Sequence, residues 1–234
     1  MKVGMWDISI TNAAVYCLIT YAIIHVTWKV LFGYDGGNVV PGLYQALAEM
    51  MYSFVLALAE EQLGNKAEKY MGIIFTTWLY ILCANVLGLI PFSFATTSQL
   101  VIAFGLSFSL FIGLTLIGVM KHGVHFLSFF LPSGAPIALA PLLVIIELIS
   151  YVFRPISLGV RLFANITAGH SLLAIIAGFA YGMMHACKWF SIVAIVPAAV
   201  IVIIYGLELA VALLQAYVFV VLLCIYLKDA MELH

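Results

Sequence analysis

The sequence predicts an all-α polytopic membrane protein, on the evidence of composition, hydropathy and the length of its apolar runs. Hydrophobic residues make up 66% of the 234 residues and charged residues only 8%, while the mean hydropathy is +1.21. A soluble domain carries roughly 25% charged residues, so this composition cannot supply a water-facing surface. In hydrocarbon each backbone polar group needs a partner within the protein, which a helix provides within one segment. We therefore expect a single membrane domain over residues 1–234, built from helical spans.

The same composition argues against several other classes of protein. A net charge of −1 gives no reason to expect a nucleic-acid partner. The first residues lack a secretory signal pattern and the Arg- and Ser-rich composition of a transit peptide, so insertion of the chain as written is expected. The cysteines show no paired spacing and are interpreted as small helix residues, not as disulfide partners or metal ligands. These cysteines are Cys17, Cys83, Cys187 and Cys224.

The N-terminal part, residues 1–69, is predicted to hold one span and one helix at the membrane interface. Residues 8–32 form the apolar span, and the run Gly33–Asn38 is a turn. The following helix, about 42–63, carries three acidic residues, which makes a full crossing costly. We therefore expect this amphipathic helix to lie along the interface. The acidic residues are Glu49, Glu60 and Glu61.

Residues 70–120 are predicted to form a transmembrane hairpin. Its arms are residues 70–90 and 98–120, joined by Pro91–Thr97. In the second arm small residues recur every four positions, which suits close helix packing. Chance recurrence in a Gly-rich chain is an equally good explanation of that pattern. The small residues are Gly105, Ser109 and Gly113.

The lysines predict which side of the membrane each connection faces. If residues 33–70, the 121–136 loop and the C-terminus share one side, that side holds five lysines and the other holds two. By the positive-inside rule the lysine-rich side is the cytoplasm of a bacterium or the matrix of a mitochondrion. His122 and His125 have no further ligand nearby, so they indicate a loop and not a metal site. The five lysines are Lys29, Lys66, Lys69, Lys121 and Lys228, and the two are Lys2 and Lys188.

The C-terminal part, residues 137–228, contains two apolar runs that are too long for upright spans. As single helices, residues 137–184 and 191–228 would measure roughly 70 Å and nearly 60 Å. The bilayer core is about 30 Å thick and ordinary tilts are about 20°. Either each run breaks into several crossings or each lies far off the membrane normal. Since neither contains a polar turn at mid-length, we expect a hairpin of two long, strongly tilted helices, kinked near Pro155.

A few ionisable and polar side chains are stranded in these apolar runs. A guanidinium at the centre of a membrane helix costs on the order of 3 kcal/mol, and Arg161 has no carboxylate between Glu147 and Glu208 with which to pair. The structural alternatives for Arg161 are a buried ion pair and a depth in the membrane other than the one inferred here. The functional interpretation is a fixed positive charge that faces a pathway or a partner's carboxylate. The stranded set is Glu147, Arg161, Asn165, His170, Glu208 and Gln215.

The antiparallel hairpin predicts which of these residues lie at the same level. A turn centred on Lys188 sets Arg161 level with Gln215, and His170 level with Glu208. Glu147 then lies toward the inside, Arg161 near the middle and the His170–Glu208 pair toward the outside, as along an interrupted proton route. Nine residues turn a helix by roughly 900°, so Arg161 and His170 face opposite ways unless the helix bends or the route passes around it.

Each member of this set has a structural alternative. Glu208 could be a protonated carboxyl group bonded to a neighbouring backbone carbonyl. His170 could form a simple interhelical hydrogen bond, and Glu147 could lie at the interface. Intramembrane ionisable residues are more often functional than structural as a class.

Two long motifs resemble the signature helices of subunit a of the F-type ATP synthase. They are Arg161-Leu-Phe-Ala-Asn165-Ile-Thr-Ala-Gly-His170 and Gly206-Leu-Glu208-Leu-Ala-Val-Ala-Leu-Leu-Gln215-Ala-Tyr-Val-Phe219. Asn85-Val-Leu-Gly-Leu-Ile-Pro91 and Leu131-Pro-Ser-Gly-Ala-Pro136 also match the family pattern. The resemblance covers most of residues 70–229, whereas the first 40 residues match only in character.

The resemblance implies a proton-translocating stator subunit, with two offset half-channels that serve the carboxylates of a rotating c-ring. It implies that Arg161 faces the ring carboxylate with Asn165 and Gln215 as neighbours. His170 and Glu208 would belong to the outer half-channel and Glu147 to the inner one. The pairing of His170 with Glu208 is similar to that of mitochondrial and alphaproteobacterial members. The expected location is therefore the mitochondrial inner membrane, with a bacterial plasma membrane as the alternative, and the expected partners include the peripheral stalk, other membrane-sector subunits, protons and lipid.

Two rival functions remain at this stage. A secondary transporter with a central ionisable site would show internal repeats or paired broken helices, and no convincing repeat relates the two halves. A purely structural scaffold would leave Arg161 and Glu208 unexplained. The sequence contains no P-loop, and we expect no covalent chemistry and no cofactor in this chain. Coupling to ring rotation would separate the stator from both rivals.

Overall fold

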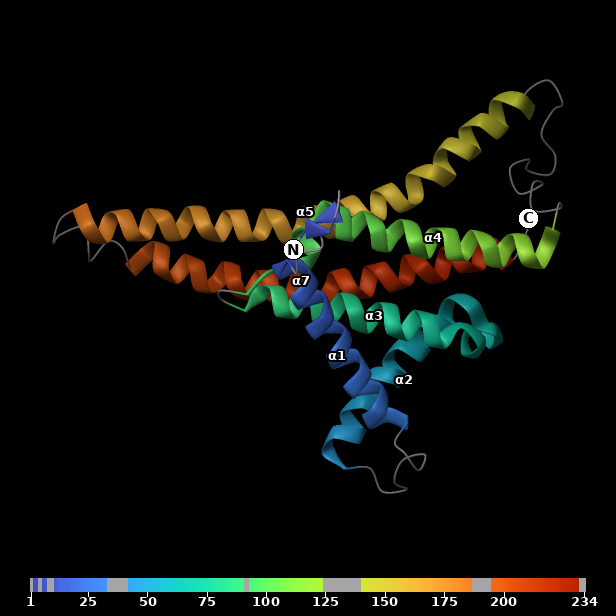
Figure 1. Ribbon diagram of the computed structural model, residues 1–234, viewed down its shortest axis with the longest axis horizontal. Coiled ribbons are helices and arrows are strands. Elements are labelled where there is room, and N and C mark those ends of the chain that lie inside the picture. The colour runs from blue at the N-terminus through green and yellow to red at the C-terminus, as the bar shows by residue number, and fades with distance from the viewer. Residues whose placement is uncertain are drawn as a thin grey trace.

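The computed structural model confirms the all-α class. It describes residues 2–3, 6–7, 11–32, 42–90, 93–123, 140–186 and 195–231. Apart from two antiparallel two-residue strands, β1 (Lys2–Val3) and β2 (Trp6–Asp7), these residues form helices and short connections (Figure 1). The helices are α1 (Asn12–Phe32), α2 (Leu43–Leu63), η1 (Gly64–Lys66), α3 (Ala67–Leu89), η2 (Thr96–Ser98), α4 (Leu100–His122), α5 (Ala140–Ala186) and α7 (Ile195–Met231).

Within the described residues, four stretches are long and apolar enough to cross a membrane. The span predicted for residues 8–32 corresponds to α1, which is not one of the four, so its crossing stays a prediction. The interfacial position of α2 also stays a prediction. Taken together, α2, η1 and α3 count as one of the stretches that are long and apolar enough to cross a membrane. The four stretches are Leu43–Leu89, Leu100–His122, Pro141–His185 and Ile195–Met231.

The two long C-terminal helices form as predicted, each without a break. α5 has 47 residues and α7 has 37, which correspond to roughly 70 Å and 55 Å. Pro155 lies inside α5, and the yellow N-terminal part of α5 diverges from the orange remainder in Figure 1. A helix-interior proline removes one backbone hydrogen bond and bends the helix without ending it. The turn near Lys188 lies outside the described residues, and the tilt against the membrane stays a prediction.

The central element is α7, which contacts α2, α3, α4 and α5. The predicted hairpin of residues 70–120 needs a correction in its packing. Its arms exist as α3 and α4, but α3 packs mainly on α7 and α4 packs mainly on α5 (Figure 1). A short sequence connection therefore does not make these two helices neighbours, because α7 lies between them.

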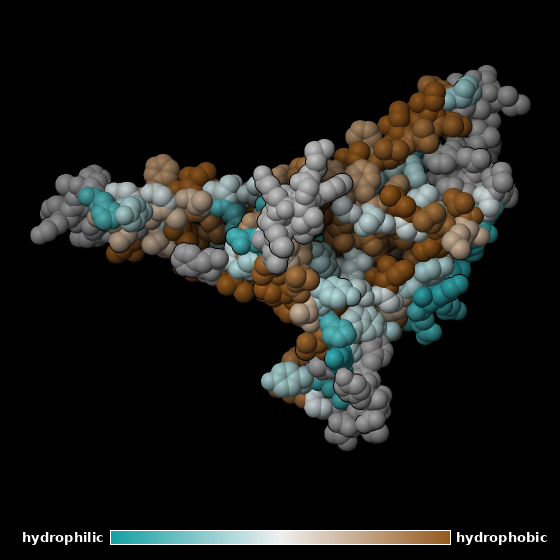
Figure 2. Space-filling view, viewed as in Figure 1, coloured by the Kyte–Doolittle hydropathy of each residue, from teal (hydrophilic) through white to brown (hydrophobic). Residues whose placement is uncertain are grey.

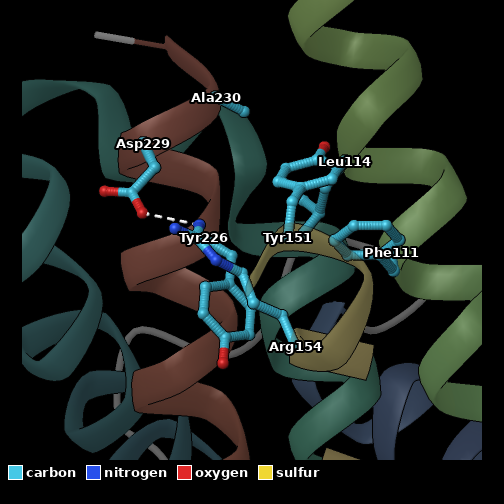
Figure 3. A pocket seen from close by; sticks show the side chains of 7 residues that line it. All are labelled: Phe111, Leu114, Tyr151, Arg154, Tyr226, Asp229 and Ala230. Carbon is cyan, nitrogen blue, oxygen red and sulfur yellow. Dashed lines mark hydrogen bonds and ion pairs between the residues drawn. The ribbon is translucent and has the colours of Figure 1, made fainter. Parts of the chain in front are cut away.

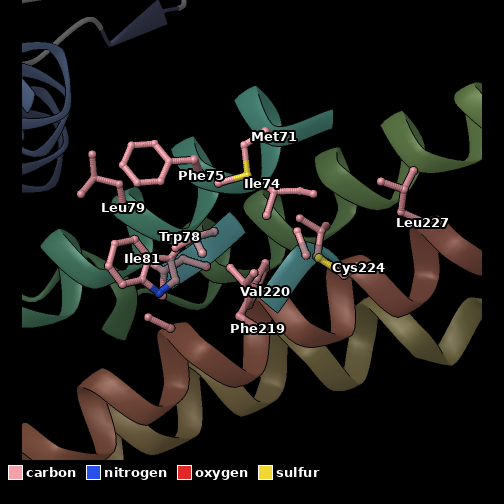
Figure 4. Packing of buried hydrophobic residues seen from close by; sticks show 14 of the residues in the cluster. Met71, Ile74, Phe75, Trp78, Leu79, Ile81, Phe219, Val220, Cys224 and Leu227 are labelled. Carbon is pink, nitrogen blue, oxygen red and sulfur yellow. The ribbon is translucent and has the colours of Figure 1, made fainter. Parts of the chain in front are cut away.

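The apolar core sits where α3 meets α7, with α2 covering it. Phe75 and Ile74 of α3 are 0% and 1% exposed, and Phe219 and Val220 of α7 are both 0% exposed (Figure 4). Dense packing of these apolar side chains against one another stabilises the fold, even where lipid replaces water as the solvent. This core fixes α7 and leaves its opposite side free to pair with α5.

The small-residue pattern of α4 does not provide the close packing that it indicated. A Cβ built on Gly105 or Gly113 would meet nothing within 4 Å. The close approach involves Gly159 of α5 instead, where an added Cβ would lie 2.8 Å from the Ser107 Oγ of α4. Within the described residues, Gly105 and Gly113 of α4 therefore make no close contact with another helix.

Candidate functional site

The facing sides of α5 and α7 bring the predicted polar residues together in nearly the expected register. The Asn165 Nδ2 donates a hydrogen bond of 2.8 Å to the Gln215 Oε1. Gln215 is 1% exposed whereas Asn165 is exposed, so this bond lies at the edge of the interface between the helices. The prediction set Gln215 level with Arg161, and the structure pairs it with the residue one turn further along α5.

The carboxyl group of Glu208 lies in a cavity between α5 and α7. Glu208 is 8% exposed, and its carboxylate lies so close to Gly169 that a Cβ at residue 169 would collide with it. His170 lines the same cavity, which has a volume of about 240 Å³. The structure therefore brings together the acid and the base that the register prediction placed at one level.

The two ionisable side chains in this cavity have no hydrogen-bond partner within the described part of the chain. Both carboxylate oxygens of Glu208 and the Nε2 of His170 are buried without a hydrogen bond there. The two structural alternatives for these residues, a carboxyl bonded to a backbone carbonyl and a simple interhelical hydrogen bond, are therefore wrong for the described residues. Buried polar atoms are normally paired with protein or with ordered water, so this cavity is suited to hold water.

A second, hydroxyl-lined cavity meets His170 from the side of the α3–α4 connection. It has a volume of about 410 Å³, and His170 lines both cavities. The sequence analysis did not identify its hydroxyl groups, because isolated Ser and Thr residues in apolar runs carry no distinctive pattern. Its lining residues are Ser93, Phe94, Ala95, Ser98, Thr167, His170 and Ser171.

Asn85 holds the connection that forms this second cavity. Its Oδ1 accepts a hydrogen bond of 2.9 Å from the Thr97 hydroxyl, and its Nδ2 donates one of 3.4 Å to the Ala212 carbonyl. Gly88 allows the close approach, because an added Cβ there would lie 2.9 Å from the Ala95 Cβ. The motif that begins at Asn85 therefore ties α3, the connection and α7 together beside the site.

Arg161 lies on an uncovered face of α5. Its sequence neighbours Leu158, Leu162 and Ile166 are 4%, 0% and 6% exposed and face the core. Arg161 itself is exposed and forms no hydrogen bond or ion pair within the described ranges. A structural ion pair within this part of the chain, one of the two structural alternatives, is therefore wrong. The exposed residues on the same face are Ala164, Ala168, Leu172, Ile175 and Phe179.

The cavity around Glu208 extends around α5. A route through it can therefore connect His170 with Arg161, although the two side chains lie on opposite faces of the helix. The α5 residues that line it extend from Asn165 to Leu172 and occupy more than one side of the helix. His170 contacts it on the far side from Arg161, and Asn165 contacts it one turn from Arg161. A route from His170 to the face of Arg161 therefore does not require a second bend in the helix.

Glu147 belongs to a different environment, at the end of α5 that precedes Pro155. Its side chain is 36% exposed, and its Oε1 lies 4.0 Å from the Arg154 Nη2. The Arg154 Nη1 forms an ion pair of 2.8 Å with the Asp229 Oδ2 of α7 (Figure 3). The guanidinium also lies 5.3 Å from the ring centroid of Tyr226 and 5.6 Å from that of Tyr151, within cation–π range.

Arg154 and Asp229 are neighbours of the predicted residue Glu147 that the sequence analysis missed. One signal was available: Glu147, Arg154 and Arg161 follow one another at intervals of seven residues, which places them along one stripe of a helix. Asp229 offered no such signal, because it follows Lys228 in a short polar tail. Within the described residues, no group of three or more His, Cys, Asp or Glu side chains could hold a metal ion.

Comparison with known proteins gives a match along nearly the whole chain. A family model described as ATP synthase A chain matches residues 14–228, a range that contains all six predicted site residues. The ATP synthase subunit a of Brassica napus is 46% identical over 239 residues, which cover 100% of this chain and 92% of that protein. The subunit a of Marchantia polymorpha is 45% identical, with 100% and 94% covered. That of Chondrus crispus is 42% identical, with 97% and 89% covered.

Proposed function

Because this chain belongs to the ATP synthase A chain family and is thus a membrane-sector component of an ATP synthase, we propose that it carries protons to and from the carboxylates of a rotating c-ring. The observation that carries the proposal is the cavity that holds an unpaired His170 and Glu208 and extends to Asn165, one turn from the exposed Arg161. Unpaired ionisable groups in a membrane segment are costly, and they are typical of ion pathways.

Protons from the outer side enter through the hydroxyl-lined cavity and reach His170. The imidazole accepts a proton at one nitrogen and releases one to the Glu208 carboxylate across the shared cavity. Asn165 and Gln215 then lie between Glu208 and the face that carries Arg161. This polar path hands the proton to a ring carboxylate, and the neutral carboxyl group can then enter the lipid at a much lower cost than the ion.

Arg161 ends the outer path and sets the charge of the ring carboxylate. A carboxylate beside a fixed guanidinium is favoured in its charged form, so it gives up its proton there. The same positive charge repels protons that would otherwise leak directly from one half-channel to the other. Its exposure, without a partner in the described residues, supports a counter-charge outside this chain.

Glu147 receives the released proton on the inner side. It lies fourteen residues before Arg161, roughly 21 Å along the helix, and on nearly the same stripe. Its half-exposed carboxylate supports an exit to water. The inner and outer paths therefore meet the ring at different heights, so that a proton crosses only when the ring turns.

The apolar face of α5 around Arg161 supplies the surface for the ring. Leu172, Ile175 and Phe179 are 46%, 58% and 68% exposed along it. The peripheral stalk and other membrane-sector subunits are the further partners in this proposal. We place the complex in the mitochondrial inner membrane, because the His170–Glu208 combination resembles the mitochondrial type; a bacterial plasma membrane is the alternative.

The test is ATP-driven proton pumping by the complex reconstituted in vesicles with Arg161→Ala. The variant subunit should assemble, since removing a charge from lipid eases insertion. It should pump no protons, and its passive proton leak should rise because no charge separates the half-channels. Normal pumping by assembled Arg161→Ala complexes would refute the proposal. A secondary transporter would instead move its substrate in vesicles that lack the ring.

A further inference from the structure

A concave pocket lined by lysines lies at the end of the molecule where α3 begins and where α4 and α7 end. Its volume is about 640 Å³, and Lys66, Lys69 and Lys121 line it together with Asn65. These residues come from η1, α3 and α4, so three separate elements converge on one site. Figure 2 shows hydrophilic surface over the start of α3, beside the hydrophobic surface of the helices.

The position of each lysine has a structural cause. Gly64 ends α2 with a positive φ of 57°, a conformation that glycine adopts without strain. Lys66 and Lys69 follow this turn and line the pocket. The Lys121 ammonium donates a hydrogen bond of 3.0 Å to the carbonyl oxygen of Met231, at the end of α7. The His122 Nε2 lies 3.1 Å from the same oxygen. Lys121 is therefore held in place and is not a freely moving surface side chain.

The pocket is lined by three lysines, and none of the described residues that line it is acidic. The pocket also lies on the lysine-rich side, which the positive-inside rule places toward the cytoplasm or the matrix. Basic pockets between membrane helices on that side are suited to phosphate-bearing headgroups.

An apolar stripe leads away from the pocket along α4. Ile112, Leu116 and Met120 recur every four residues and are 55%, 55% and 86% exposed. Met120 and Ile117 also line the pocket. Residues four apart lie above one another on a helix, so this stripe forms a continuous apolar track that starts at the lysines. A free phosphate ion would use the lysines alone, whereas a phospholipid would use both features.

We propose that the lysine pocket binds the phosphate headgroup of an anionic phospholipid, with an acyl chain along the α4 stripe. The bound lipid would link the α2–α3 turn to the ends of α4 and α7 and so fix the inner end of the helix bundle. The site is separate from the proton path, since it shares no lining residue with the cavities around His170.

The test uses the intact reconstituted complex and a photoactivatable phosphatidylglycerol that carries its reactive group in the acyl chain. The vesicles contain either phosphatidylcholine alone or phosphatidylcholine with an equal amount of phosphatidylglycerol. Crosslinks should map to the stretch of α4 around Leu116 and Met120. A phosphatidylcholine probe of the same design should label this stretch much less.

The variant Lys66→Gln/Lys69→Gln should weaken this labelling. Each lysine near an anionic headgroup contributes roughly a fivefold factor in affinity, so the pair should account for roughly 25-fold at low salt. Both side chains are exposed, and Lys121 keeps its bond to Met231, so the variant should assemble normally. Lys228→Gln is the matched control, because Lys228 is an exposed lysine at the same end that does not line the pocket.

Three results would overturn the proposal. Equal labelling of α4 by the two lipid probes would show that the headgroup charge does not matter. Unchanged labelling of the double variant, or an equal loss in Lys228→Gln, would show that the pocket does not select the lipid. Full displacement of the probe by inorganic phosphate would show that the lysines bind a free anion and that the apolar stripe takes no part.

Discussion

The parts of the α5–α7 pair that the proposal assigns to the outer and inner sides hold their charged groups in opposite environments. In the outer part, Glu208 and His170 lie unpaired at a cavity of about 240 Å³. In the inner part, Arg154 and Asp229 form an ion pair of 2.8 Å beside a space of only about 10 Å³ (Figure 3). Both parts belong to the same two helices in the same antiparallel arrangement.

Under the proposed function, this difference separates charges that exchange protons from charges that hold the structure together. A paired charge in a filled space has its partner already, so it stabilises one conformation and cannot readily exchange a proton. An unpaired acid and base at a cavity can each gain and lose protons through water. Arg161 lies between the two parts and belongs to neither, since its face of α5 is uncovered. Under the proposal, the role of each charged side chain therefore follows from its partners and its surrounding space, and not from its residue type.

The largest expected difference is between Arg161 and Arg154, which lie two turns apart on α5. Arg161→Gln should reduce ATP-driven pumping per assembled complex by about a thousandfold, at the upper end of what one preorganised charge contributes at a reacting site. Arg154→Gln should leave pumping per assembled complex within about twofold. Proton uptake by vesicles, normalised to assembled complex, measures both. Equal losses in the two variants would mean that the two environments do not differ in function.

The second prediction concerns the outer pair. Glu208→Gln or His170→Gln should each slow pumping by roughly a hundredfold, as expected for a positioned acid or base. The double variant should lose less than the two single losses combined, because neighbours in one network are not additive. Lowering the pH on the outer side should partly restore proton-driven ATP synthesis by Glu208→Gln, since protons enter from that side during synthesis and entry is then the step that limits the rate.

The measurement is the rate of ATP synthesis driven by an imposed proton gradient, against outer pH, for the two single variants and the double variant. Strictly additive losses without a pH response would mean that His170 and Glu208 do not share a channel. Cysteines introduced at positions 170 and 208 give an independent check of the register, since they should cross-link across the cavity.

A third and smaller effect is expected at Gly169. The methyl group of Gly169→Ala would occupy the space of the Glu208 carboxylate, which must then move. We expect about tenfold slower pumping, less than the roughly hundredfold that a misplacement of about 1 Å can cost at a reacting group. Gly178→Ala is the matched control on the same helix, because an added Cβ there meets nothing within 4 Å. Identical rates for the two variants would argue against a requirement for the precise position of Glu208.

The fourth prediction concerns the stability of the complex and not its pumping rate. Breaking the inner ion pair with Arg154→Gln or Asp229→Asn should lower the free energy of unfolding by roughly 1–3 kcal/mol, since the side chains are 20% and 32% exposed and partly screened. The double variant should be more stable than the sum of the single losses predicts. Thermal loss of the assembled complex in detergent measures this. A complete absence of coupling between the two positions would show that the pair does not hold α5 to α7.

The sequence by itself determined the class of the protein, the two long helices and the level at which His170 meets Glu208. Length against bilayer thickness and a fixed rise per residue are enough for these conclusions, because they depend only on local helix geometry. The register was correct to about one turn, as the pairing of Gln215 with Asn165 in place of Arg161 shows.

Only the tertiary structure decided which faces are covered. It placed α7 between α3 and α4, left the stripe of Gly105 and Gly113 unpacked, exposed Arg161 and joined Arg154 to Asp229. The physical reason lies in the solvent. In water, an apolar face of a helix marks its buried side, but lipid is as apolar as a protein core, so the hydrophobic pattern of a membrane helix does not distinguish the two. Which face of a membrane helix is buried in protein depends on close packing and pairing between distant segments, and no local periodicity in the sequence predicts it.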